Sequence, residues 1–179
     1  MFSQFIKGKI FIAIDAANIE HSAKDLKMKI RYKKLYDFFA KQTDFLQINF
    51  YSARFDSDSH NRFLTFLKKN NFKIITKAVK IIKDSDKGDI RKANFDVEIT
   101  ADTLIKMKEF ETFVLFSGDS DFDYLIKLLK AGGKKVIIVS SKYHVSKELI
   151  MSCSKYFDIK KFKGIFLEKQ KSPSFSTGG

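Results

Sequence analysis

The sequence contains little cysteine or histidine and no long apolar run. Cys153 is its only cysteine, so the chain lacks the residues for a disulfide framework or a cysteine-based zinc site. Its 3 histidines, His21, His60 and His144, are scattered singly, and we interpret each as a surface or loop residue rather than a ligand. No apolar run reaches the roughly 18 residues of a membrane span, and residues 1–7 lack the core of a signal peptide. We therefore expect a cytoplasmic protein with no membrane partner.

Acidic residues are scarce relative to basic ones. Lysine and arginine total 34 against 21 aspartate and glutamate residues, which gives a formal net charge of +13. This charge favours an anionic partner, and nucleic acid comes first because phosphate contacts dominate such binding. A lysine-rich surface that serves only solubility is the alternative. The length of 179 residues and the hydrophobic content of 44% suit one domain with a substantial core.

The stretch 111–123 combines a buried strand with closely spaced acids. Its apolar run stops at two small residues, Ser117 and Gly118. Acids then occupy every second position: Asp119, Asp121 and Asp123. The apolar residues that follow recur at helical spacing, and Asp119 or Ser120 can cap that helix. We therefore predict a strand, an acidic turn and a helix.

The first predicted strand ends in a similar way. Residues 9–14 form an apolar run that closes on Asp15, followed by Asn18. In an open parallel sheet, ligands bind beyond the carboxyl ends of the strands, where the winding reverses. Two such strands side by side would bring four polar side chains into one cleft, namely Asp15, Asn18, Asp119 and Asp121. Carboxylates gathered so closely repel by several kcal/mol at an effective dielectric of about 20, so Mg²⁺ or Mn²⁺ is the simplest occupant. Ser117 would help to position a ligand or phosphate there.

A third group of acids lies on a helix predicted from Asn94 to about Lys108. We place Asp96, in its first turn, at the cleft, although a carboxylate there also suits the helix dipole without any catalytic role. Asp102 lies roughly 120° around the helix from Asp96, so we place it at the rim. The apolar side chains predicted to pack inward are Val97, Ile99, Ala101, Leu104 and Ile105.

Strands alternate with helices along the chain. We therefore predict an α/β fold, a three-layer α/β/α sandwich with a mainly parallel sheet of the PIN-like (Rossmann-like) kind. Residues 1–168 form the expected domain, and 169–179, rich in Lys, Ser, Thr and Gly, a disordered tail. A third strand is expected over 72–82. The segment 83–92 is expected to be an exposed, mobile connection, in which Lys87, Arg91 and Lys92 either hold a phosphate backbone or belong to a solvated loop.

Three motifs together resemble the NYN domain family, and most closely the LabA-like branch of the PIN-like nuclease group. They are Ile12-Ala13-Ile14-Asp15-Ala16-Ala17-Asn18, Lys92-Ala93-Asn94-Phe95-Asp96-Val97-Glu98-Ile99-Thr100-Ala101-Asp102 and Ser117-Gly118-Asp119-Ser120-Asp121-Phe122. The resemblance runs from about Lys9 to Leu167. It implies a metal-dependent ribonuclease fold in which Asp15, Asp96, Asp119 and Asp121 correspond to acidic cleft positions and Asn18 to an asparagine after the first strand. One departure is Ala93-Asn94-Phe95-Asp96, where the family often has Lys-Gly-x-Asp.

These observations predict an endoribonuclease that uses Mg²⁺ or Mn²⁺ and acts on single-stranded or structured RNA, with DNA as a further possible substrate. A catalytically silent RNA-binding or regulatory module of the same fold is the main alternative. A phosphatase of the haloacid dehalogenase type also uses Asp-x-Asp after a strand, but normally after the first one, where this chain has Asp15-x-x-Asn18. A calcium-binding EF-hand is excluded, because Tyr124 and Lys130 replace its required Gly and Glu.

Overall fold

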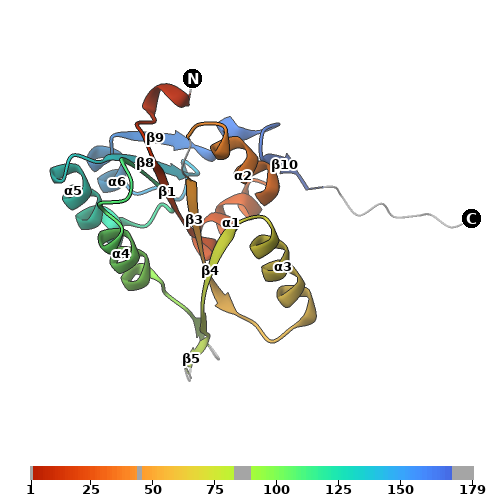
Figure 1. Ribbon diagram of the computed structural model, residues 1–179. Coiled ribbons are helices and arrows are strands. Elements are labelled where there is room, and N and C mark those ends of the chain that lie inside the picture. The colour runs from red at the N-terminus through yellow and green to blue at the C-terminus, as the bar shows by residue number, and fades with distance from the viewer. Residues whose placement is uncertain (1, 44–45, 83–89, 171–179) are drawn as a thin grey trace, which may run out of the picture.

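A parallel sheet of six strands forms the centre of the fold, with helices on both faces (Figure 1). The computed structural model describes residues 2–43, 46–82 and 90–170. The sheet has the strand order β4-β3-β1-β7-β8-β9, and every neighbouring pair is parallel. Its strands are β1 (Ile10–Asp15), β3 (Leu46–Arg54), β4 (Phe72–Ala78), β7 (Thr112–Phe116), β8 (Lys135–Ser140) and β9 (Lys155–Asp158). The predicted three-layer α/β sandwich is therefore confirmed.

The helices form two outer layers because side chains alternate between the two faces of each strand. One layer consists of α1 (Ala16–Asp25), α2 (Tyr32–Ala40) and α3 (Asp58–Lys69), and the other of α4 (Asp96–Ile105), α5 (Asp123–Ala131) and α6 (Lys147–Ser152). On β1, Ile12 and Ile14 pack in the core shared with the first layer, whereas Phe11 and Ala13 pack in the core shared with the second. Both sides of the central strand are thus buried, as its continuous apolar sequence predicts.

The winding of the sheet reverses at β1. From β1 the chain moves outward to β3 and β4, and it then crosses to β7 and moves outward the other way to β8 and β9. In the register of the sheet, Ile14 lies beside both Phe50 and Phe116. The residues that follow Ile14 and Phe116 therefore emerge together at the carboxyl edge, where an open sheet binds its ligands.

Two short antiparallel pairs lie outside the main sheet. The expected strand 72–82 is split: its last residues form β5 (Lys80–Ile82), which pairs with β6 (Ile90–Lys92). The last three residues of the segment predicted as an exposed, mobile connection therefore form a strand, while residues 83–89 lie outside the described ranges. The isolated Ile90, opposite Ile82 in this pair, was too weak a pattern to predict a strand.

The second pair joins β2 (Met28–Ile30) to β10 (Leu167–Lys169). The backbone N–H of Gln170 also donates to the carbonyl oxygen of Lys27, at 3.1 Å. Ordered structure therefore extends two residues into the segment predicted as a tail, and residues 171–179 lie outside the described part. The described ranges also contain three short 3₁₀ helices: η1 (Ser3–Phe5), η2 (Ser120–Phe122) and η3 (Ile159–Phe162).

Helix α4 packs differently from the prediction. Of its five apolar side chains expected to face inward, only Ile99 is buried, while Val97 and Ile105 are 77% and 78% exposed. The buried stripe consists of Phe95, Ile99 and Thr103, which recur every fourth residue. The apolar pattern misled because a polar residue, Thr103, occupies this inner stripe. Across all described residues, no helix combines the length and apolar character that crossing a membrane requires.

Candidate active site

Asp15 lies at the point where β1 ends and α1 begins. As the N-cap of α1, its Oδ1 accepts a hydrogen bond from the backbone N–H of Asn18 at 3.3 Å. Its Oδ2 accepts a second hydrogen bond from the Ser117 hydroxyl, also at 3.3 Å. Ser117 directly follows β7 and is fully buried. The carboxylate is therefore held between the ends of the two central strands.

Asn18 connects the same two segments a second time. Its Oδ1 accepts a hydrogen bond from the backbone N–H of Gly118 at 3.0 Å, which ties the first turn of α1 to the loop after β7. Gly118 is packed so closely that a Cβ there would overlap the carbonyl oxygen of His144. The backbone N–H of Ser146 donates to the Gly118 carbonyl oxygen at 2.9 Å. The loops after β1, β7 and β8 thus meet at Gly118.

Asp119 and Asp121 belong to the turn that follows Gly118. Asp119 caps η2: its Oδ1 accepts from the backbone N–H of Asp121 at 3.1 Å. The backbone N–H of Asp119 donates to the Ser117 hydroxyl oxygen at 3.3 Å. Phe122, at the end of η2, is fully buried and anchors the turn. The buried Phe122 thus fixes a turn in which Asp119 is half-buried and Asp121 exposed at the sheet edge.

Asp96 reaches this edge from the second helical layer. It is the first residue of α4, and its backbone N–H donates to Asn94 Oδ1 at 2.8 Å. Asn94 occupies the position where the resemblance leads one to expect glycine. Through this hydrogen bond its side chain fixes the backbone at the start of α4. One carboxylate oxygen from each of Asp96, Asp119 and Asp121 lies within 4.8 Å of the other two. We call these three residues the acidic cluster.

The negative charge of this region is incompletely compensated. Burial raises the pKa of the Asp15 carboxyl to about 6, against the stabilising hydrogen bonds from Asn18 and Ser117, and the charges of Asp96 and Asp119 raise it further. Burial also raises the pKa of Asp96, as do the charges of Asp119 and Asp121, while the Asn94 hydrogen bond and Lys77 lower it. Among the side chains that the structure describes, none forms an ion pair with Asp15 or the acidic cluster. A cation of high charge would relieve this repulsion.

The acids open into a pocket of about 310 Å³. Asp15, Asn18, Asp96 and Asp119 line it, together with His21 and His144. Carboxylate and carboxamide oxygens are the ligand types that Mg²⁺ and Mn²⁺ prefer, and a cluster of carboxylates suits a doubly charged ion. The donor set therefore fits the divalent metal that the sequence predicted.

The remaining predicted residues lie in several places. Ser120 is exposed at the start of η2, next to the acidic cluster. Lys87 lies outside the described residues, and for Arg91 and Lys92, in β6, the structure describes the backbone alone. The predicted contacts of these three with a phosphate backbone therefore stay a prediction.

Asp102 does not reach the pocket, contrary to its expected position at the rim. Its Oδ2 accepts from the Tyr51 hydroxyl at 2.9 Å and from the Asn49 amide at 3.2 Å. Both partners are fully buried in β3, where Asn49 pairs with Ala13 in the middle of β1 rather than with its end. A buried carboxamide needs a polar partner, and Asp102 provides one at that depth of the sheet. Burial, followed by the nearby Asp102 charge and hydrogen bond, raises the pKa of Tyr51.

The sequence did not predict that two histidines would line this pocket. His21 and His144, interpreted as isolated residues, place their ring centroids 4.9 Å apart. Asp25, one turn after His21 on α1, completes a group of potential metal ligands with them. The spacing of four residues between His21 and Asp25 was the one sequence signal for this group, since it places both on the same face of a helix.

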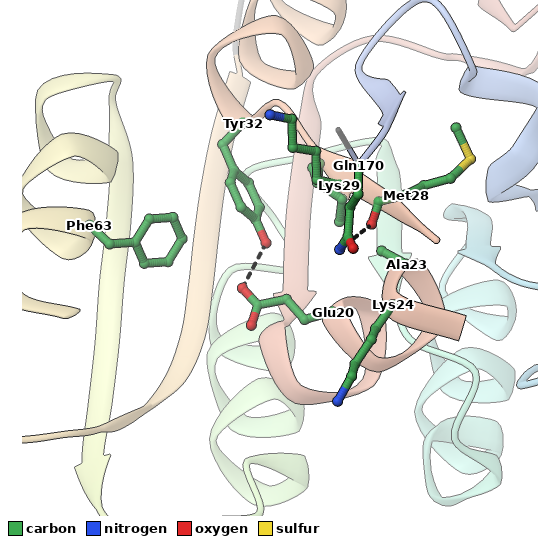
Figure 2. A pocket seen from close by; sticks show the side chains of 9 residues that line it. Glu20, Ala23, Lys24, Met28, Lys29, Tyr32, Phe63 and Gln170 are labelled. Atoms are coloured by element: carbon green, nitrogen blue, oxygen red, sulfur yellow. Dashed lines mark hydrogen bonds between the residues drawn. The ribbon is translucent and has the colours of Figure 1, made fainter. Parts of the chain in front are cut away.

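A second hollow, of about 220 Å³, is lined mainly by α1 and β2, with one residue each from α2 and α3 (Figure 2). Its lining includes Glu20, whose carboxylate accepts from the Tyr32 hydroxyl at 3.1 Å. Figure 2 also shows the side chain of Gln170 turned toward the Met28 carbonyl oxygen, to which it donates. Glu20 is the one acid among the described residues that line this hollow. A grouping of acids like that of the other pocket is therefore missing from it.

Comparisons with known proteins agree with this architecture. The NYN domain model matches residues 9–160. The low amplitude and bright protein LabA of Synechococcus elongatus is 26% identical over 173 residues, covering 94% of this chain and 92% of LabA. A crystal structure of a protein of unknown function from Vibrio parahaemolyticus superimposes with a TM-score of 0.75 at 22% identity, covering 90% of this chain and 97% of that one. The chain, with a parallel sheet whose winding reverses at β1 and with acids after the strand ends, belongs to the NYN domain family.

Proposed function

We propose that this protein is a cytoplasmic, divalent-metal-dependent ribonuclease that cuts phosphodiester bonds within RNA at the acidic pocket. The observation that carries the proposal is the approach of three carboxylates from two separate segments to within 4.8 Å of one another. Their placement at the carboxyl edge of β1 and β7 is the position at which open parallel sheets bind ligands. Membership of the NYN family, which belongs to the PIN-like nucleases, supports the same class of reaction.

The chemistry of the pocket suits phosphodiester hydrolysis. A bound Mg²⁺ or Mn²⁺ ion would supply Lewis acidity to the phosphate and lower the pKa of a water molecule. The side chains that would hold one or two such ions are Asp15, Asp96, Asp119 and Asp121. Ser117 would orient Asp15 through its hydroxyl hydrogen bond, and Asn18 would hold the Gly118 backbone in place. These contacts fix the carboxylates before substrate binds, so little reorganisation is required during the reaction.

The charge distribution supports a nucleic-acid substrate. The whole chain carries a formal net charge of +13, yet the three carboxylates of the acidic cluster lie close together at the edge of the sheet. Basic residues elsewhere on the surface would attract the phosphate backbone of RNA, while the pocket would require a cation before a phosphate could enter. This division favours an enzyme whose acidic pocket would hold the metal ion and whose basic surface would hold the RNA.

Cleavage of labelled single-stranded RNA with Mn²⁺ tests the proposal. Wild-type protein should cut the RNA, and Asp119→Asn should lose at least about 100-fold in rate, because even partners outside the ligand shell contribute about 10–100-fold. Asp37→Asn is a matched control: it removes one carboxylate from α2, where Asp37 pairs with Lys33 at 2.9 Å, and should cleave normally.

The same assay separates the alternatives. Binding of RNA without cleavage by the wild type would identify a silent RNA-binding module, and equal cleavage by wild type and Asp119→Asn would exclude the pocket as the active site. Parallel reactions with single-stranded DNA and a small phosphomonoester test substrate class. Hydrolysis of the phosphomonoester alone would support the phosphatase alternative.

A further inference from the structure

We infer that His21, Asp25 and His144 form a second metal site, for a divalent transition ion of the zinc class, beside the acidic pocket. One potential ligand atom from each of the three side chains lies within 4.8 Å of the other two. His144 Nε2 is 2.7 Å from Asp25 Oδ2, and His21 Nδ1 is 4.0 Å from the same oxygen. The two rings meet edge to face, with an angle of 79° between their planes.

The backbone holds these three ligands in fixed positions. His21 and Asp25 are four residues apart on α1, so they project from the same face of the helix. His144 lies in the loop after β8, where its backbone N–H donates to the Ser141 carbonyl oxygen at 3.1 Å. The close packing of the His144 carbonyl against Gly118 fixes this loop to the end of β7. The site is therefore assembled from rigid segments and requires small side-chain movements to close around an ion.

The distances between the three side chains are compatible with metal ligation. A hydrogen bond explains the contact of His144 with Asp25, but leaves His21 too far away to share in it. In a tetrahedral site with bonds of about 2.0–2.1 Å, neighbouring ligand atoms are about 3.3 Å apart. The two observed separations, 2.7 Å and 4.0 Å, lie on either side of that value. Shifts of under 1 Å in these two separations would bring them to that value, and the third, between the two histidines, is at most 4.8 Å.

The donor set selects a different metal from that of the acidic cluster. Imidazole nitrogen suits zinc and other late first-row ions, whereas carboxylate oxygens suit Mg²⁺ and Mn²⁺. His21 and Asp25 are 64% and 48% exposed, so water can complete the coordination of an ion held there. Because His21 and His144 line the same pocket as Asp15 and Asp119, that ion would also be accessible to a phosphate entering the pocket. The inferred site is independent of whether the acidic cluster supports catalysis.

Zinc titration of protein without a histidine tag, in millimolar Mg²⁺, tests the inference. The Mg²⁺ occupies carboxylate sites, so Zn²⁺ binding then reports on the histidines. Wild-type protein should bind one equivalent of Zn²⁺, and the Co²⁺-loaded form should show visible absorption bands characteristic of imidazole ligation. His21→Ala should weaken Zn²⁺ binding by at least about tenfold, because a direct ligand matters at least as much as an outer-shell partner.

Two controls make the result specific. His60→Gln removes a histidine on α3, and Asp119→Asn alters the acidic cluster; both should keep the wild-type Zn²⁺ affinity and Co²⁺ spectrum. The melting temperature of metal-free His21→Ala should match that of the wild type, since His21 is largely exposed. Failure of the wild type to bind Zn²⁺, equal binding by His21→Ala, or loss of binding only in Asp119→Asn would overturn the inference.

Discussion

The Asn18 side chain accepts a hydrogen bond from the backbone N–H of Gly118 at 3.0 Å, across 100 residues of sequence. The bond joins the loop that carries Asp15 to the loop that carries Asp119. Gly118 is buried, so removing the Asn18 side chain takes away the acceptor of its N–H. Asn18 is therefore expected to support both the stability of the sheet edge and the geometry of the acidic pocket.

Replacing Asn18 with alanine should lower the free energy of unfolding by about 1–3 kcal/mol, the usual consequence of leaving a buried donor unpaired. RNA cleavage should fall by about tenfold or more, because a misplaced carboxylate is costly for catalysis. Urea unfolding and initial cleavage rates measure the two effects. Asn18→Asp is the matched variant, since a carboxylate can also accept the Gly118 hydrogen bond. Stability equal to wild type in Asn18→Ala would contradict the role given to this bond.

Gly118 and Gly133 require glycine for two different physical reasons, which substitution by alanine can compare. At Gly118 the obstacle is space, because a Cβ would overlap the His144 carbonyl; at Gly133, φ is +77° and no atom lies within 4 Å of the added Cβ. Gly133→Ala should cost about 1–2 kcal/mol from the left-handed backbone alone. Gly118→Ala should cost about as much or more through overpacking, and should also disturb the His144 loop.

Zinc affinity distinguishes these two glycine variants, provided that the metal site involving His144 exists. Gly118→Ala should weaken Zn²⁺ binding, whereas Gly133→Ala, at the far end of α5, should leave it unchanged. Chemical denaturation gives the stability of both proteins. A Gly118→Ala protein as stable as the wild type would show that the loops after β7 and β8 can separate without cost.

The stability of metal-free protein should depend on the ionisation of Asp15. The pKa of this carboxyl is about 6 in the folded chain, above its ordinary value of 3.8. The folded state therefore holds the proton more tightly, and the associated stabilisation is complete below about pH 4 and is lost as the pH rises through about 6. The difference amounts to at most about 3 kcal/mol.

Asp15→Asn removes this titration. Relative to the wild type, the variant should gain stability as the pH is raised from about 4 to about 7 in the presence of a chelator, because it carries no charge to bury. Urea denaturation at several pH values measures the gain. Parallel pH profiles for the two proteins would mean that ionising Asp15 costs the folded protein no stability in the absence of metal.

Asp102 should contribute to stability rather than to metal binding. Asp102→Ala removes the acceptor of the buried Tyr51 hydroxyl and one of the two acceptors of the Asn49 amide, whose other acceptor is the Tyr51 oxygen. The unpaired Tyr51 hydroxyl should cost about 1–3 kcal/mol. Asp102→Asn keeps one carbonyl acceptor and should recover part of this loss. Calorimetric titration with Mn²⁺ should give wild-type affinity for both variants. A large loss of Mn²⁺ affinity in Asp102→Asn, with unchanged stability, would contradict this and give Asp102 a role in metal binding.

The sequence predicted the layered fold and the meeting of Asp15 with Asp119 because both follow from local patterns. An apolar run that stops at an acid marks a strand end, and the winding of a parallel sheet brings two such ends together. The packing of α4 could not be predicted in this way. Its inner stripe includes the polar Thr103, whose hydroxyl donates to the Ile99 carbonyl oxygen within the helix, and the neighbouring Asp102 accepts from the buried Asn49 of a distant strand.

The histidine group illustrates a second limit. His21 and His144 are joined by no periodic pattern, and they meet only because the loop after β8 folds back onto Gly118. Such loop geometry depends on contacts between segments far apart in sequence. The helical spacing of His21 and Asp25 was visible, but on its own it does not distinguish a ligand pair from ordinary surface residues.

A crystal of the protein soaked in Mn²⁺ tests the central claim most directly, because the anomalous signal locates the ion without any assumption about substrate. We predict a peak at about 2.2 Å from carboxylate oxygens of Asp96, Asp119 and Asp121, and its absence from Asp119→Asn crystals. Electron density that leaves this cluster without a metal, while the three carboxylates keep their positions, would contradict the proposed active site.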